Sequence, residues 1–131
     1  MRGKVFRREG EYWTIAYEGL VFRVRDTKGL RYLALLLRDP GRRHPARDLL
    51  AAVTTSRGAG DTPPRAQTAA DEHARIVVTK HLRAAIRRIQ AHHAALGFHL
   101  DTTIKTGQQC AYLPDPTRPT RWAVGDEGQA P

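Results

Sequence analysis

The sequence predicts one small domain of mixed α+β class. A β-rich run lies on either side of a Glu-Gly pair near the N-terminus, three stretches with apolar residues at helical spacing follow, and a second β-rich run comes after them. The 131 residues are enough for one compact core and too few for two ordinary ones. We expect the domain at residues 11–114, between an N-terminal arm of residues 1–10 and a disordered, proline-rich tail of residues 115–131.

The first hairpin is expected within residues 11–25, EYWTIAYEGLVFRVR. Alternation of apolar and polar residues predicts two antiparallel strands, and Glu18-Gly19 suits the turn between them. Trp13 is expected to pack under the helix that follows. The alternative is that the hairpin exposes Trp13 or Tyr17 to a partner.

The first helix is expected to begin after Asp26 or Thr27, either of which can cap it, and to run to about Arg38. Asp39-Pro40-Gly41 ends it, because the residue before proline avoids helical angles. Leucines lie on most of its sides, which predicts a helix buried nearly all round.

A short amphipathic second helix is expected from Pro45, which suits a first helical turn, through about Val53. Residues 54–72 then contain Gly, Pro, Ser, Thr and Ala but no large apolar residue. This composition predicts a flexible surface loop.

The third helix is predicted within VVTKHLRAAIRRIQAHH, residues 77–93, and is expected to end at residues 95–97. One side is apolar and predicted to face the core: Val78, Leu82, Ala85, Ile86 and Ile89. Lys80, Arg83 and Arg87 gather opposite, with Arg88 at the margin, and no Asp or Glu occurs from residue 73 to residue 100. Residues 100–112 are then expected to form a second hairpin around Thr106-Gly107.

The charge balance is strongly basic, with a formal net charge of +9 and an isoelectric point near 10.6. Unbalanced positive charge usually meets an anionic partner, and nucleic acid is the first candidate. The preference for Arg over Lys has two open explanations, which are guanidinium chemistry with phosphates and a GC-rich genome.

Several function classes are not indicated. Cys110 is the single cysteine, no signal-peptide pattern begins the chain, and the apolar run at residues 33–37 is far too short for a membrane span, so a cytoplasmic protein is expected. The adjacent His92 and His93 point to different sides of a helix, and His99 adds no ligand spacing, so no metal is expected. No catalytic constellation or cofactor motif is found, and we expect no enzyme and no cofactor.

Three phrases carry a family resemblance: TKGLRYLALLLRDPGRRHPARDLL from Thr27, VTKHLRAAIRRI from Val78, and the TIKTGQQCAY run that ends at Tyr112. Together with the predicted order of elements, they resemble the winged helix-turn-helix effector domain of OmpR-type response regulators over residues 10–114. GLRYLALLL with PGR in the first phrase, and KTG with CAY in the last, are also similar to a module of predicted regulators from high-GC bacteria. Departures are the long loop, a longer wing, Ala111 in place of a usual glycine, and the lack of a receiver domain.

The resemblance implies a sequence-specific, double-stranded DNA-binding transcriptional regulator, with the third helix in the major groove and the wing on the backbone or minor groove. The implied contacts fall in three groups: Thr79, Lys80, Arg83, Arg87 and Arg88 on the third helix, Arg42, Arg43 and Arg47 around the second, and Lys105 and Gln108 on the wing. The alternative function is a winged-helix protein-interaction module without DNA binding.

Partners other than DNA follow from the same resemblance. A lone effector domain needs a separate signalling protein to supply its signal. Specific regulators usually pair on two half-sites, so either a homodimer through the hairpin at residues 12–24 or a monomer paired by another chain is expected. The sequence leaves these two alternatives open.

Overall fold

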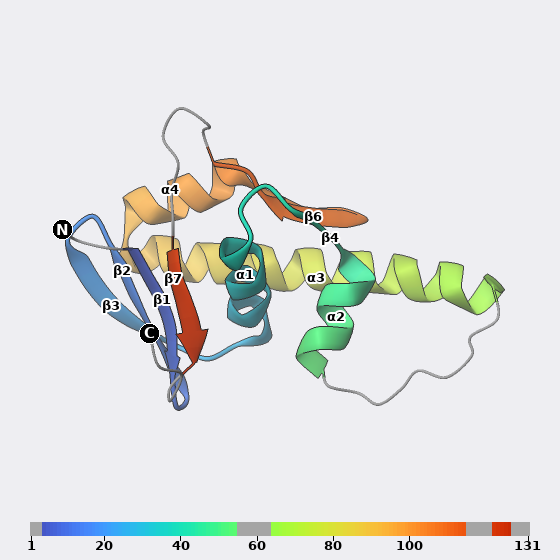
Figure 1. Ribbon diagram of the computed structural model, residues 1–131, viewed down its shortest axis with the longest axis horizontal. Helices are drawn as coiled ribbons and strands as arrows, with labels where there is room; N and C mark the ends of the chain where they lie inside the picture. The colour runs from blue at the N-terminus through green and yellow to red at the C-terminus, as the bar shows by residue number, and fades with distance from the viewer. Residues whose placement is uncertain (1–3, 55–63, 115–121, 127–131) are drawn as a thin grey trace.

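The computed structural model describes residues 4–54, 64–114 and 122–126. These residues form four helices and two small sheets, which confirms the mixed α+β class (Figure 1). The elements in chain order are β1 (Lys4–Glu9), β2 (Tyr12–Tyr17), β3 (Leu20–Arg25), α1 (Lys28–Arg38), β4 (Arg43–Pro45), α2 (Ala46–Thr54), α3 (Pro64–His92), α4 (Ala94–Thr103), β5 (Ile104–Lys105), β6 (Gln109–Tyr112) and β7 (Trp122–Asp126).

The larger sheet has the strand order β3-β2-β1-β7 and lies at the C-terminal end of the long helix α3 (Figure 1). The expected hairpin is confirmed as β2 and β3, which pair antiparallel. Glu18 and Gly19 both have positive φ angles, 49° and 83°, as a two-residue turn between twisted strands requires. Trp13 is buried in the core, as expected, against the ring of Phe6 at a centroid distance of 5.0 Å.

Two boundaries predicted from the sequence are wrong. Residues 4–9 of the expected arm form β1, which pairs with β2 on one side and with β7 on the other. Within the expected disordered tail, residues 122–126 form β7, parallel to β1, and Trp122 is buried. Each segment contributes one buried aromatic side chain to the core. The rings of Phe6 and Trp122 pack edge to face with a centroid distance of 6.1 Å. The rest of the tail lies outside the described residues.

Helix α1 is the centre of the core. Its N-cap is Thr27, whose hydroxyl accepts a hydrogen bond from the Leu30 backbone N–H at 3.3 Å. Its buried residues lie on nearly all sides, as the leucine-rich sequence predicts: Gly29, Leu30, Tyr32, Leu33, Ala34, Leu36 and Leu37.

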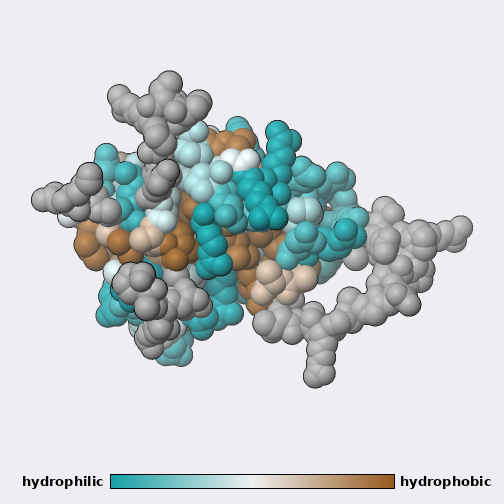
Figure 2. Space-filling view, viewed as in Figure 1, coloured by the Kyte–Doolittle hydropathy of each residue, from teal (hydrophilic) through white to brown (hydrophobic). Residues whose placement is uncertain are grey.

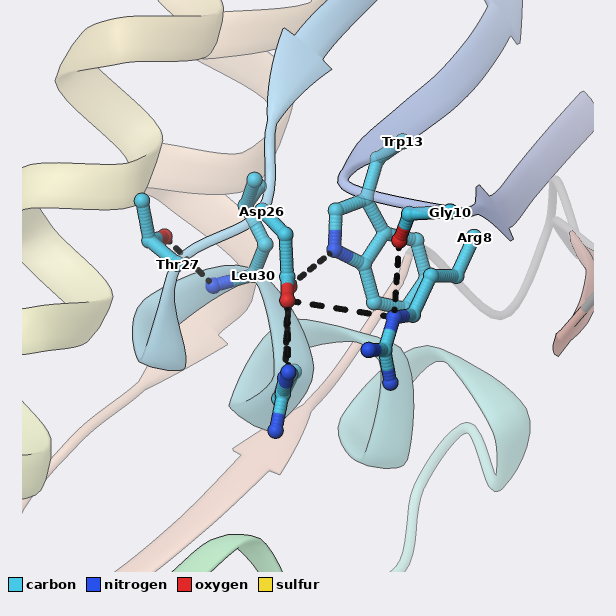
Figure 3. A network of polar contacts seen from close by, with 7 residues as sticks. Arg8, Gly10, Trp13, Asp26, Thr27 and Leu30 are labelled. Atoms are coloured by element: carbon cyan, nitrogen blue, oxygen red, sulfur yellow. Dashed lines mark hydrogen bonds and ion pairs between the residues drawn. The ribbon is translucent and has the colours of Figure 1, made fainter.

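Asp26 ties α1 to the sheet (Figure 3). Its carboxylate accepts hydrogen bonds from the Trp13 indole N–H at 2.7 Å and from the Arg31 guanidinium at 2.6 Å, and Arg8 lies 3.8 Å away. Burial alone would raise the pKa of Asp26, but the hydrogen bonds from Arg31 and Trp13 outweigh it and lower the pKa. The carboxylate therefore stays charged and joins β1, β2 and α1.

Helix α1 crosses α3 at very short range. A Cβ atom added to Gly29 would lie 2.1 Å from the backbone oxygen of His81 and 2.9 Å from the Cβ of Ala85. Only glycine allows the two backbones to approach so closely. The crossing holds the middle of α3 against the core.

Helix α2 begins one residue later than predicted. Pro45 is the last residue of β4, a short strand that the sequence did not indicate, and Ala46 starts the helix. Leu49 and Val53 are buried, as an amphipathic helix requires.

Helix α3 is longer than the predicted third helix, because it begins at Pro64. Residues 64–72 of the expected loop are therefore helical, which corrects the loop prediction for that part, and residues 55–63 lie outside the described residues. Pro64 suits a first helical position, and Ala66, Ala69 and Ala70 are strong helix formers, so the composition that looked loop-like is also compatible with a helix.

Residues 100–103, expected in a strand, belong instead to a fourth helix, α4. His93 separates it from α3 and caps it, since its side chain accepts a hydrogen bond from the Leu96 backbone N–H at 3.2 Å. Gly97, expected to end the third helix, lies inside α4, where an added Cβ would be 2.4 Å from the Cβ of Gln90. Close packing of α4 on α3 explains this glycine.

The smaller sheet has the order β4-β6-β5, with both pairs antiparallel. The hairpin around Thr106-Gly107 is confirmed, with Gly107 at a φ of 138°. Residues on one face of the sheet, Ile104, Cys110 and Tyr112, are buried. The opposite face carries the exposed side chains of Arg43, Gln109 and Lys105, with the buried Ala111 between Arg43 and Lys105.

Candidate functional site

The predicted two-sided character of the third helix is confirmed in α3. Its inner side, with Val78, Leu82, Ala85, Ile86 and Ile89, is at most 5% exposed. On the outer side four side chains are exposed and are called here the cationic face: Lys80, Arg83, Arg87 and Arg88. Thr79, at the border, is half-buried.

No carboxylate neutralises the cationic face within the part of the chain that the structure describes. None of its four cations lies within ion-pair distance of an Asp or Glu there, whereas Arg75, on the preceding turn, is paired with Glu72. Among the described residues, no ion pair offsets the positive charge of this face. Such a surface favours an anionic partner.

A second group of cations lies on the exposed face of the β4-β6-β5 sheet. Arg43 and Lys105 are both in register with Ala111, one from each neighbouring strand, so their side chains leave the same face on either side of a small residue. With strands about 4.8 Å apart, their Cα atoms are separated by roughly 10 Å. Figure 2 shows hydrophilic residues gathered over β4 and β6.

A pocket of about 290 Å³ lies beside this group and is lined by Pro45, Arg47, Asp71, Gln108 and Gln109. It brings together the start of α2, the turn between β5 and β6, and α3. The backbone supports it, because the N–H of Ala46 donates to the carbonyl of Gln108 at 2.8 Å. Arg47 is not available as a free cation, since its guanidinium lies 3.2 Å from the Asp71 carboxylate.

The pocket and the cationic face lie on different sides of α3. Sixteen positions separate Asp71 from Arg87, which is about 24 Å along the helix axis. At 100° per residue, Asp71 also lies about 120° around α3 from Arg83. The cationic face points away from the body of the domain, while the pocket lies against it.

The predicted contact residues are therefore distributed as follows. The cationic face and Thr79 share α3, Arg43 and Lys105 share one face of the smaller sheet, and Arg47 and Gln108 share the pocket. Arg42 is exposed and lies 4.0 Å from Asp39. Sequence reasoning missed Asp71 and Gln109. Asp71 lay in the expected loop, and Gln109 pairs with β4, a strand that the sequence did not indicate.

The histidines that were considered as metal ligands serve packing instead. His92 stacks on Phe22 at a centroid distance of 5.3 Å, and His93 caps α4. His99 Nε2 lies 2.6 Å from the Tyr112 hydroxyl. Burial, assisted by the nearby Lys4 ammonium, lowers the pKa of His99.

Cys110 is fully buried, and burial raises the pKa of its thiol. Such a thiol is protonated and a poor nucleophile. No helix of the described residues is long and apolar enough to cross a membrane.

Comparisons with protein-family models, with curated proteins and with solved structures give no match for this chain. The site is therefore interpreted from its own chemistry. That chemistry consists of the guanidinium and ammonium groups of the cationic face and of the smaller sheet, together with the amide side chains of Gln108 and Gln109. All of these groups can donate hydrogen bonds to anionic oxygens.

Proposed function

We propose that the protein binds double-stranded DNA as a sequence-specific transcriptional regulator, with the cationic face of α3 in the major groove. The observation that carries the proposal is the exposed and unpaired state of Lys80, Arg83, Arg87 and Arg88 on a single helix. Arginine can donate two hydrogen bonds to guanine O6 and N7, and lysine can meet phosphates.

The order of elements supports a winged-helix topology. Helix, strand, helix, helix and hairpin follow one another as α1, β4, α2, α3 and β5-β6, and β4 joins the hairpin in one sheet. The OmpR-type resemblance of the sequence implies this arrangement. The inserted helix α4 and the parallel strand β7 are departures from the expected pattern.

The α3 face is the primary contact in this proposal, and Arg43 and Lys105 on the sheet are secondary. We assign these two cations to the DNA backbone, because they lie on the smaller sheet and not on the helix that we assign to the major groove. The sheet cations would therefore add salt-dependent affinity rather than base recognition.

Two matched double variants test the proposal. Arg83→Ala with Arg87→Ala removes two charges from the cationic face, and Arg7→Ala with Arg25→Ala removes two from exposed strand positions. We expect the first variant to lose affinity in a gel-shift titration, at about 1 to 3 kcal/mol per arginine that reads a base, and to change sequence preference. Equal losses from both variants would contradict a specific role for α3.

A protein-interaction module without DNA binding is the second candidate. It is favoured by the exposed Leu20 and Val21, 58% and 66% accessible, at the start of the edge strand β3. A bound protein would contact this apolar edge with little dependence on salt, whereas phosphate contacts release counterions. Salt dependence therefore separates the two candidates.

A further inference from the structure

One large apolar side chain interrupts the outer side of α3. Ile76 is 54% exposed, and among the described side chains it is the only large hydrophobic of this helix that is exposed. At 100° per residue, Ile76, Lys80, Arg83 and Arg87 lie within a sector of about 60°. Ile76 therefore belongs to the same surface as the cationic face.

The chemistry of this neighbourhood restricts what Ile76 can contact. Its side chain has no hydrogen-bonding group, so it gains nothing from phosphate oxygens. In the major groove the apolar group presented by a base pair is the 5-methyl group of thymine. Ile76 lies about one helical turn before Lys80, on the same side of α3 as Lys80, Arg83 and Arg87, so it can bury that methyl group when these cations lie in the groove.

Resting on the proposed function, we propose that Ile76 reads thymine, by packing against the 5-methyl group of a thymine in the major groove. The cations on the same sector attract and align the duplex, and Ile76 contributes base selectivity. Loss of the contact exposes about one methyl group, which corresponds to a change in affinity of about fourfold.

The test compares thymine with deoxyuridine, which lacks only the methyl group. A tight-binding duplex is first selected from a random-sequence pool with the wild-type protein, and deoxyuridine is then placed at one thymine at a time. We expect one position, or two adjacent ones, to lower wild-type affinity about fourfold. Ile76→Ala should bind the thymine duplex with that same loss and should show no further loss on deoxyuridine substitution.

Phe98→Ala is the control, because Phe98 is another exposed large hydrophobic residue, 67% accessible, and lies on α4 outside the proposed binding surfaces. It should leave both the affinity and the deoxyuridine effect unchanged. If the wild type binds DNA but no deoxyuridine position matters, or if Ile76→Ala keeps the effect, the thymine contact is wrong while DNA binding stands. If no duplex is bound at low salt, the proposed function fails and the thymine contact fails with it.

Discussion

Replacing Gly29 by alanine tests the α1–α3 crossing that presents the cationic face. The added Cβ would lie 2.1 Å from the backbone oxygen of His81, whereas ordinary contact begins at 3.4 Å, so the helices must separate by about 1.3 Å. The obstacle is backbone, which a change of side-chain rotamer does not relieve. Overpacking of a core typically costs about 1 to 3 kcal/mol, and occasionally more.

Two opposing effects set the net change. Alanine in place of glycine within a helix stabilises by about 1 kcal/mol, which offsets part of the clash. Because backbone meets backbone, we place the clash at the upper end of its range or beyond, and we expect Gly29→Ala to lower the free energy of unfolding by about 2 kcal/mol or more.

Urea unfolding followed by the fluorescence of Trp13 and Trp122, both buried, measures this change. Lys28→Ala is the control, because Lys28 is exposed in the same helical turn, and it should change stability by no more than about 0.5 kcal/mol. A Gly29→Ala protein as stable as the wild type would refute the close crossing.

Three further predictions follow from other parts of the molecule. Trp122→Ala should cost about 3 kcal/mol or more, because Trp122 is buried beside Phe6, and an unchanged urea midpoint would contradict the docking of β7. Burial lowers the pKa of His99 in the folded protein, so as pH drops through about 6.5 the unfolded chain takes up its proton first, and the free energy of unfolding should fall. The fall should be less steep in His99→Gln, and identical pH profiles for the two proteins would exclude His99 as its cause. Asp71→Asn should release Arg47 and strengthen DNA binding with a steeper salt dependence, and unchanged binding would mean that Arg47 is remote from the duplex.

Local patterns predicted the parts of the fold that depend on near neighbours. The Glu18-Gly19 turn, the Thr27 cap and the inner side of α3 follow from turn chemistry, capping and helical periodicity. These features are determined within a few residues of chain. The sequence therefore indicated the cationic face correctly as an exposed surface.

Features that depend on distant partners were not predicted. β1 and β7 are joined although more than a hundred residues separate them in the chain, and no local pattern reports that pairing. Gly97 looked like a helix end because its contact with Gln90 is tertiary. Asp71 remained hidden for the same reason, since its partner Arg47 belongs to another helix.

The central claim is that the cationic face of α3 binds a DNA duplex, and its most direct test is equilibrium binding of a mixed-sequence duplex across a range of salt concentrations. If about five phosphates are neutralised, the logarithm of the association constant should fall linearly with the logarithm of salt concentration, with a slope of about −4.5. Lys80→Ala should make the slope shallower by about 1, while Lys28→Ala should leave it unchanged. Absence of binding at low salt, or equal slopes for wild type and Lys80→Ala, would contradict the claim.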